Sequence, residues 1–286
     1  MPLATGIPVD GNQFVTNHKL ALGRTVDYPD KYAPEELDAI PRSRCREPLG
    51  ITAELPFQGA DVWNAWELTW LHPGGRPAVA TARIVVPVES PNIIESKSLK
   101  LYLNSFAMTE FRSVGDIAEL IRGDLSRITE TPVDVRVAPV WSTEARTVAR
   151  LAGTSLDDLD VDCDDRDVNT DPLRADSDNI VTVDLHTHLL RSLCPVTAQP
   201  DTGSLQIAYR GPAIEPAGLL RYIVSYRQHS DFHEGCIEKM FVDIMDRCKP
   251  LDLTLHARYQ RRGGIDINPF RSTSAKIPRD LRLWRQ

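Results

Sequence analysis

The chain lacks the features of a disulfide-stabilised, membrane-spanning or polyanion-binding protein. Its five cysteines include no CxxC pair, and their odd number favours a reducing compartment over a disulfide framework. No stretch approaches the roughly 20 apolar residues of a membrane span, and no basic region followed by an apolar run marks a signal peptide. A formal charge of −7 argues against a nucleic acid held through its phosphates. We therefore expect a cytoplasmic protein whose partners are small molecules or proteins, with no direct nucleic-acid or membrane contact.

The chain has enough apolar residues to bury a substantial core. Its 286 residues, 42% hydrophobic, fit one large domain or two modest ones. Residues 1–60 are rich in proline, glycine and charge, so we expect an extended leader there. Periodic segments follow in a first module, residues 61–150. In order they are β-rich runs at Trp63–Trp70 and Val79–Val88, an apolar helical stripe from Leu99 to Phe106, a helix opened by the capping-box-like pair Ser113 and Asp116, and an alternating strand at 133–137.

An acidic stretch interrupts the pattern between residues 153 and 179. Aspartates crowd it, which raises the question of a calcium-binding loop. Counted from Asp160, the sixth position is Asp165 where such a loop needs glycine, and the twelfth is Asp171 where it needs glutamate. We therefore interpret residues 151–180 as a solvated linker or insertion.

Residues 181–286 repeat the order of the first module at a constant offset of 120 residues. The offset takes Glu95 to Glu215 and Tyr102 to Tyr222, and it holds through two helices and a strand. The other matched pairs are Leu99 with Leu219, Leu103 with Ile223, Ser105 with Ser225, Phe106 with Tyr226, Ile117 with Ile237, Leu120 with Met240, Ile121 with Phe241, Leu125 with Met245, Val133 with Leu253 and Val135 with Leu255. A Gly263-Gly264 turn then leads into a closing strand at Ile265–Ile267. The sequence predicts an α+β protein made of two tandem strand-strand-helix-helix-strand modules.

The two modules differ in their polar residues. The first helix of the front module carries Ser96, Lys97, Ser98 and Lys100, whereas its counterpart in the back module reads Pro216, Ala217, Gly218 and Leu220. The back module instead has His233-Glu234 at the start of its second helix, where the front module has Ser113-Val114. Because the two modules keep complementary polar sets, we expect one composite site rather than two.

The stretch from Leu193 to Asp201 occurs only in the back module. Cys194 precedes Pro195, and Asp201 follows Pro200, so two fixed φ angles make this segment a stiff loop. A thiol and a carboxylate on such a loop can act as nucleophile and proton donor. A lone cysteine is more often a packing residue, so spacing alone does not decide the point.

Four motifs in this order resemble those of the NADPH-dependent 7-cyano-7-deazaguanine reductases, the nitrile oxidoreductase (QueF) family of queuosine biosynthesis in its two-module form. They are Glu95-Ser-Lys-Ser-Leu-Lys-Leu-Tyr, Cys194-Pro-Val-Thr-Ala-Gln-Pro-Asp, Phe232-His-Glu and Arg261-Arg-Gly-Gly-Ile-Asp-Ile-Asn-Pro. The resemblance extends from about residue 20 to the C-terminus and is weak only in the acidic stretch. It implies the tunnelling fold, in which antiparallel ββααββ units with helices on one face assemble around a shared barrel. At least a homodimer is therefore expected.

The resemblance also implies the chemistry. Cys194 attacks the nitrile carbon of a deazapurine to form a thioimide, NADPH reduces it in two hydride steps to the amine, and Asp201 protonates the nitrogen. General thiol chemistry agrees with these roles, since a thiolate is a strong nucleophile for an electrophilic carbon and a covalent bond retains a small substrate through two reductions.

The remaining motif residues divide between substrate and cofactor. Glu234 and His233 resemble the substrate end, Phe232 is placed to stack on the purine ring, and Glu95 with Ile94 and Ser96 resembles a second substrate contact. A His-Glu pair at this place is otherwise typical of an ordinary helix start. For the NADPH site the resemblance indicates Ser96, Lys97, Arg262 and Gly263, with Lys100 a weaker candidate; cations suit the 2′-phosphate and glycine permits close backbone approach.

Two alternatives stay open. One is a metal-dependent tunnelling-fold hydrolase of GTP or pterins, for which the alternating His186 and His188 are the only suggestive ligands. No matching cysteine pair lies nearby, so we expect no metal. The other alternative is a non-catalytic purine-binding module in which Cys194 is inert. A Rossmann site is not supported, because no GxGxxG motif follows a strand.

Overall fold

The computed structural model describes residues 28–52, 54–142, 148–274 and 281–286. The long strands are β2 (Gln58–Leu71), β3 (Pro77–Pro87), β5 (Asp134–Pro139), β7 (Ala175–Leu193), β8 (Pro200–Ile214), β9 (Asp252–Tyr259) and β10 (Ile265–Ser272). The helices are α1 (Ser43–Arg46), α2 (Ser96–Asn104), α3 (Val114–Thr129), α4 (Pro216–Val224) and α5 (His233–Cys248). Short elements complete the set: β1 (Ala39–Pro41), β4 (Asn92–Ile94), β6 (Thr154–Ser155) and 3-10 turns at Pro34–Glu36, Glu47–Leu49 and Ser225–Gln228.

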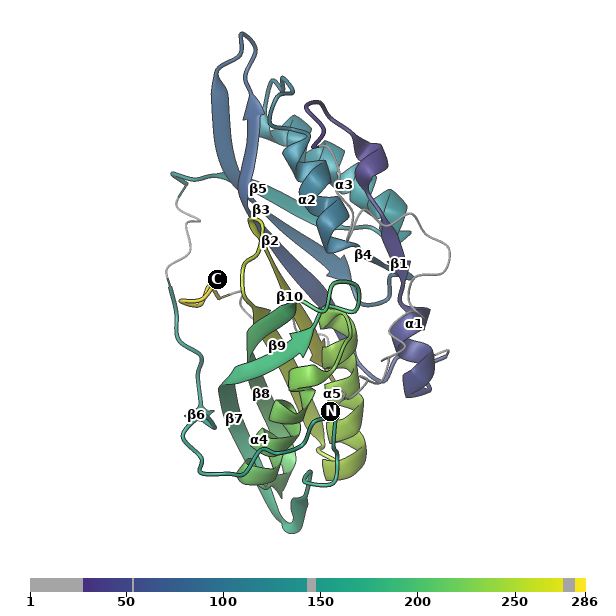
Figure 1. Cartoon of the computed structure of the whole chain (residues 1–286), viewed down its shortest axis with the longest axis vertical. Coiled ribbons are helices and arrows are strands. Elements are labelled where there is room, and N and C mark those ends of the chain that lie inside the picture. Colours follow the sequence, from purple (N-terminus) through teal and green to yellow (C-terminus); the bar gives the residue numbers. More distant parts are fainter. Residues whose placement is uncertain (1–27, 53, 143–147, 275–280) are drawn as a thin grey trace, which may run out of the picture.

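The long strands and β6 form one eight-stranded sheet in the order β5-β3-β2-β10-β9-β8-β7-β6. Every pairing in it is antiparallel except that of β6 with β7. This confirms the predicted α+β class with antiparallel sheets. The predicted closing strand is β10, and it lies between β9 of the back module and β2 of the front module. The sheet is therefore continuous across the two modules, as Figure 1 shows.

The helices cover one face of the sheet, with α2 and α3 over the front strands and α4 and α5 over the back strands (Figure 1). Each pair closes its own hydrophobic core. The helix predicted after Ser113 is α3, in which Ile117, Ile121 and Leu125 are fully buried and recur every four residues. The predicted capping box is also present: Ser113 accepts from the Asp116 amide and Asp116 accepts from the Ser113 amide.

The segments before each module are ordered parts of the fold. The expected leader contains β1, which pairs with β4, and α1; its residues 1–27 lie outside the described part of the chain. The boundary at residue 60 falls inside β2, and the boundary at 180 falls inside β7, because both strands run further toward the N-terminus than their apolar patterns. Both boundaries are therefore too late.

The two preceding segments also repeat one another. The Ala33 amide donates to Ser105 Oγ in the front half, as the Asn169 amide donates to Ser225 Oγ in the back half, each at 3.1 Å. The Glu95 amide donates to the Asp38 carbonyl and the Glu215 amide to the Arg174 carbonyl, each at 3.0 Å. The offset is 136 residues both from Ala33 to Asn169 and from Asp38 to Arg174. These segments therefore do not follow the 120-residue repeat of the modules.

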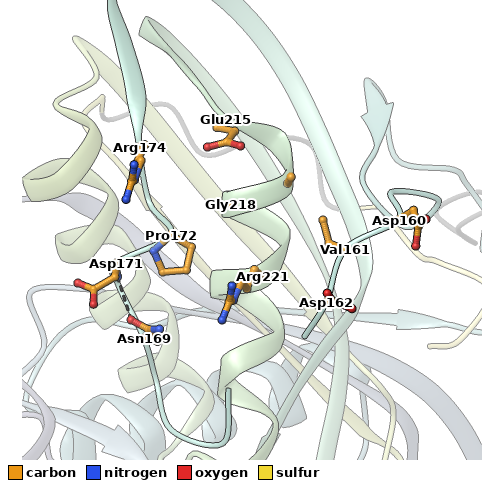
Figure 2. Close-up of a pocket in the computed structure, with 11 residues that line it drawn as sticks. Asp160, Val161, Asp162, Asn169, Asp171, Pro172, Arg174, Glu215, Gly218 and Arg221 are labelled. Atoms are coloured by element: carbon orange, nitrogen blue, oxygen red, sulfur yellow. Dashed lines mark hydrogen bonds between the residues drawn. The ribbon is translucent and has the colours of Figure 1, made fainter. Parts of the chain in front are cut away.

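The acidic stretch is consequently docked on α4 rather than solvated throughout. Figure 2 shows Asp171, Pro172 and Arg174 running alongside the start of that helix. A Cβ at Gly218 would lie 2.1 Å from the Pro172 carbonyl oxygen, so glycine permits this close approach. Arg221 binds Asp165 at 2.6 Å and Asp164 at 3.1 Å. Leu156 and Leu173 are buried in the back core. Part of the expected linker or insertion thus packs on α4 and in the back core, while most of its aspartates are exposed.

Candidate active site

A pocket lies where the two modules meet along β2 and β10. Its lining from the front module includes Ile94, Glu95 and Ser96, and its lining from the back module includes Cys194, Asp201, Phe232, His233, Glu234 and Arg262. The structure thus brings together both predicted catalytic residues and all six predicted substrate residues. Of the predicted cofactor residues, Ser96 and Arg262 line this pocket, whereas Lys97 and Gly263 do not.

Cys194 begins the turn between β7 and β8. Its amide donates to the Gln199 carbonyl and its carbonyl accepts from the Ala198 amide, both at 2.9 Å. Ala198 takes a left-handed φ of 54° to close this turn. The Leu193 amide donates to the His229 carbonyl at 2.8 Å, which ties the turn to the segment entering α5. The thiol is half-buried and reduced, at the pocket wall.

Asp201 lies on β8 opposite this turn and is 4% exposed. Its Oδ2 is 3.3 Å from His233 Nε2, and its Oδ1 pairs with the Arg262 guanidinium. Burial alone would raise the pKa of Asp201, but His233, Arg262 and Lys100 together hold it below its usual range. Asp201 is therefore an anion at neutral pH, and it has to gain a proton before it can donate one.

The ring of Tyr259, on β9, packs against the imidazole ring of His233. The two rings are stacked with centroids 3.8 Å apart and an interplanar angle of 21°. Tyr259 is itself buried. In the sequence it is one more apolar-patterned position of a central strand, so nothing distinguished it from a core residue.

Two buried carboxylates face the pocket, one from each module. Glu95, 1% exposed, caps α2 by accepting from the Lys97 amide at 2.9 Å and the Ser98 amide at 2.7 Å. Glu234, 4% exposed, lies in the first turn of α5. Burial raises the pKa of Glu95, although its two backbone hydrogen bonds oppose the shift. Burial, with the negative charge of Asp61, raises the pKa of Glu234 to about 8.

Two further charged residues belong to this region. Asp231 lines the pocket just before Phe232 and accepts a hydrogen bond from the Cys45 thiol at 3.2 Å; burial raises its pKa to about 6. Lys100 lies along Gly263, where a Cβ would be 2.9 Å from Lys100 Cδ. Burial and Arg262 lower the pKa of Lys100. In the sequence, Lys100 is marked only by its place one helical turn after Ser96. No feature of the sequence marks Asp231 as a site residue.

Sequence comparisons relate this chain to known proteins. The family described as nitrile reductase, 7-cyano-7-deazaguanine-reductase N-term, matches residues 28–137, and the family described as QueF-like protein matches residues 200–277. A curated relative from Burkholderia thailandensis, the NADPH-dependent 7-cyano-7-deazaguanine reductase, is 48% identical over 267 residues, which cover 93% of this chain and 97% of the relative. The chain belongs to the QueF family. Cys194 lies between the two matched ranges.

Among solved structures, the apo form of the archaeosine synthase QueF-Like covers 35% of this chain and 96% of its own, with 17% identity and a TM-score of 0.29. In the described residues of this QueF-family chain, no helix has the length and apolar character needed to cross a membrane.

The histidines that suggested a metal site make other contacts. His188 Nδ1 lies 2.7 Å from Ser204 Oγ, and His186 Nδ1 lies 3.2 Å from the Ala152 carbonyl. Within the described ranges, no cluster of three histidine, cysteine, aspartate or glutamate side chains is placed to hold an ion.

Proposed function

We propose that this chain reduces the nitrile of 7-cyano-7-deazaguanine to the primary amine of 7-aminomethyl-7-deazaguanine with NADPH, a step of queuosine biosynthesis. The observation that carries the proposal is one pocket holding a thiol, an adjacent ionised carboxylate and two buried carboxylates from different modules. The activity printed for the Burkholderia thailandensis relative supports it.

In the first step Cys194 adds to the nitrile. The sulfur forms a bond to the nitrile carbon, and one π bond of the nitrile breaks to give a thioimide. The thiol proton passes to Asp201, whose lowered pKa makes it the base, and Asp201 then delivers that proton to the nitrogen, where negative charge develops. Asp201 therefore acts as acceptor first and donor second, which refines the expectation that it is only a donor.

Two molecules of NADPH, bound in turn, would each supply one hydride to the thioimide carbon. The C–S bond to Cys194 would break between the two transfers, and the nitrogen would take up protons, so that the amine is released and the thiol is restored. The hydroxyl and cationic groups near the pocket fit the cofactor's phosphates: Ser96 and Lys97 start α2, and Lys100 lies against Gly263. Arg262 has a second partner in Asp201. We propose that Arg262 serves both the carboxylate and the cofactor, and that Lys97 contributes to binding the 2′-phosphate.

Recognition of the purine falls to the two buried carboxylates. Glu234 accepts ring N–H groups, Glu95 holds the opposite edge beside Ile94 and Ser96, and Phe232 covers the ring face. His233 stays stacked on Tyr259, where it keeps Asp201 ionised next to the thiol.

The assembly is proposed to be a homodimer. One edge of the sheet is β5, and the other is the nineteen-residue β7, which β6 covers over two residues only. Uncovered edges of this length favour pairing with another copy. An active, strictly monomeric species in sedimentation would contradict this.

The test is NADPH oxidation with 7-cyano-7-deazaguanine, followed by absorbance, with intact mass of the protein measured after substrate alone. We expect turnover and a mass increase equal to one substrate. An inert thiol with tight substrate binding would instead support the purine-binding module. Stoichiometric metal in elemental analysis, with hydrolysis of GTP or a pterin, would support the hydrolase.

A further inference from the structure

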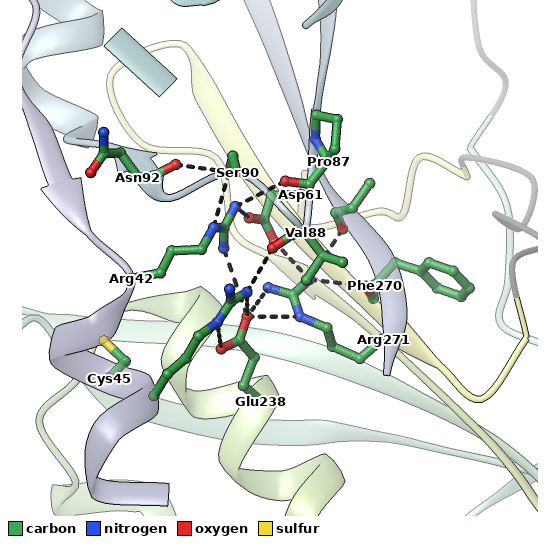
Figure 3. Close-up of polar contacts among 12 residues, drawn as sticks. Arg42, Cys45, Asp61, Pro87, Val88, Ser90, Asn92, Glu238, Phe270 and Arg271 are labelled. Carbon is green, nitrogen blue, oxygen red and sulfur yellow. Dashed lines mark hydrogen bonds and ion pairs between the residues drawn. The ribbon is translucent and has the colours of Figure 1, made fainter. Parts of the chain in front are cut away.

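A buried network of charged side chains lies beneath the substrate pocket. Figure 3 shows Arg42 and Arg271 converging on Asp61 and Glu238. Arg42 binds Asp61 at 2.6 Å, and Arg271 binds both Asp61 and Glu238 at 2.8 Å. Arg46 completes the network by binding Glu238 at 2.8 Å. None of these side chains is more than 9% exposed.

The network draws on both modules and on the segment that precedes them. Arg42 immediately precedes α1 and Arg46 is its last residue. Asp61 lies on β2 of the front module, Arg271 lies on β10, and Glu238 lies on α5 of the back module. Three guanidinium groups meet two carboxylates, which leaves one positive charge in excess. Buried charges without a counter-charge are costly, so this excess has to be matched nearby.

Glu234 is the buried carboxylate in position to match it. It precedes Glu238 by four residues on α5, so both side chains lie on the same side of that helix. Among the described residues, Glu234 Oε1 has no hydrogen-bond partner, and neither does Arg42 Nη1, which is 3.7 Å from Glu238. An unsatisfied cationic nitrogen and an unsatisfied carboxylate oxygen are thus buried in one region.

The charges around Glu234 act in opposite directions. Burial and Asp61 raise its pKa, while Arg42 and Arg271 lower it. Further titratable groups interact with Glu234, among them Cys45 on α1, Cys236 on α5 and Tyr259 on β9. Asp231, whose pKa burial raises to about 6, lines the same pocket. With a pKa of about 8, Glu234 titrates between neutral and mildly alkaline pH, so a change of one neighbouring charge alters its ionisation in that range.

We propose that Arg42 is a positioning residue for purine recognition: its guanidinium belongs to a network with one positive charge in excess and favours anionic Glu234, with Asp61 acting in the opposite sense. The inference rests on the proposed function. Anionic Glu234 accepts two ring N–H groups, whereas a protonated carboxyl offers a hydroxyl donor where the ring also has donors. The segment before the first module therefore sets the pH range in which the pocket holds its purine.

The experiment measures non-covalent binding of 7-cyano-7-deazaguanine by calorimetry in a Cys194→Ala background, between about pH 6 and about pH 9.5, a range that lies above ordinary carboxyl pKa values and brackets the pKa of about 8 of Glu234. Binding should weaken as pH falls through the Glu234 transition. Adding Arg42→Gln should move that transition up by about one pH unit, which is about tenfold weaker binding below it. Adding Asp61→Asn should move it down. Arg42→Lys keeps the charge and should leave the transition in place.

A merely structural role gives a different pattern. Loss of packing would weaken binding by the same factor at every pH, with the same sign in Arg42→Gln and Asp61→Asn, and either result would overturn the inference. If Arg42→Gln does not fold, the direction of the shift in Asp61→Asn decides. Absence of binding in the parent Cys194→Ala protein would overturn the proposed function and this inference together, whereas binding without shifts would overturn the inference alone.

Discussion

The two halves of this chain share a backbone and differ in what they display on it. In the front half the Leu71 amide donates to the Thr109 carbonyl at 2.9 Å; in the back half the Leu193 amide donates to the His229 carbonyl at 2.8 Å. The next residue is His72 in one half and Cys194 in the other. One turn of the duplicated unit thus carries the proposed nucleophile, and the other has histidine at the same place.

The starts of the first helices show the converse difference. Glu95 caps α2 with two hydrogen bonds and lines the pocket, whereas Glu215 makes no side-chain cap on α4 and has the acidic stretch beside it (Figure 2). Pro216 and Gly218 replace the front serines, and Gly218 admits the Pro172 carbonyl. A fold therefore tolerates loss of polar groups from one copy of a site when the other copy retains the complementary set.

The largest expected difference between the halves concerns the nucleophile. Cys194→Ala should abolish both the covalent adduct and nitrile reduction, because no thioimide can form, while the purine still binds. His72→Ala, at the matching turn position, should leave the rate unchanged. Intact mass and NADPH absorbance measure both. Substantial reduction by Cys194→Ala would contradict the covalent route.

Asp201→Asn should lose at least about 10²-fold in kcat, as expected on removal of a positioned acid–base group. The variant keeps the loop and the thiol but can neither take the thiol proton nor return it to nitrogen. Ala78 occupies the matching place on β3, since Ala78 pairs with Trp70 as Asp201 pairs with Ser192. Adduct formation at the normal rate by Asp201→Asn would exclude a role in the first step.

The matched glutamates test whether the chain has one site or two. Glu95→Gln should weaken substrate binding by about tenfold, because a charge-assisted hydrogen bond becomes a neutral one. Glu215→Gln should have no effect on binding. Titration of both variants with 7-cyano-7-deazaguanine checks this, and equal losses would mean that the back module holds substrate as well.

Lys97 and its counterpart Ala217 extend the comparison to the cofactor. Lys97→Gln should raise KM for NADPH about several-fold, because one charge-assisted contact with the 2′-phosphate is lost. KM for NADH should stay nearly unchanged, because NADH has no 2′-phosphate. Arg262→Gln should affect both cofactors, since Arg262 also pairs with Asp201. Steady-state kinetics with each cofactor measure the difference; equal losses in Lys97→Gln would assign that residue to other work.

The smallest effect should be the same in both halves. Ser105→Ala and Ser225→Ala each remove a hydroxyl that donates to a helix carbonyl at 2.6 Å and accepts from the preceding segment at 3.1 Å. Each should lower the free energy of unfolding by about 1–2 kcal/mol. Chemical denaturation measures both, and a cost confined to Ser105 would show that the acidic stretch docks more weakly than its counterpart.

The sequence predicted the parts of the fold that follow simple periods. The stripe of α3, its capping box and the 120-residue repeat needed only the positions of apolar and capping residues. The docked segments were missed because they hold their place through backbone hydrogen bonds to Ser105 and Ser225, which leave little trace in composition. Their different offset also removed them from the repeat.

The site was predicted through its motifs, and the missed residues are those outside them. In the sequence, Tyr259 resembles an ordinary core residue and Arg42 an ordinary charged residue of the leader. In the fold, Tyr259 stacks on His233, and Arg42 is proposed to favour the anionic form of Glu234. Their roles depend on contacts between positions far apart in sequence, such as Arg42 with Glu238 and Tyr259 with His233. A single sequence does not encode such distances in any local pattern.

The placement of β10 has a consequence for how the protein is made. Ile265 pairs with Ala65 and Ser272 with Gln58, so the last long strand of the chain closes on the first. On a ribosome the front module can collapse early, but its edge at β2 stays unpaired until nearly the whole chain has emerged. Contacts of such long sequence separation are slow to form. The unpaired edge of β2 is thus where a nascent chain can pair with a wrong strand. We expect chaperones to bind the nascent chain until residues 265–272 have left the exit tunnel and can pair with β2.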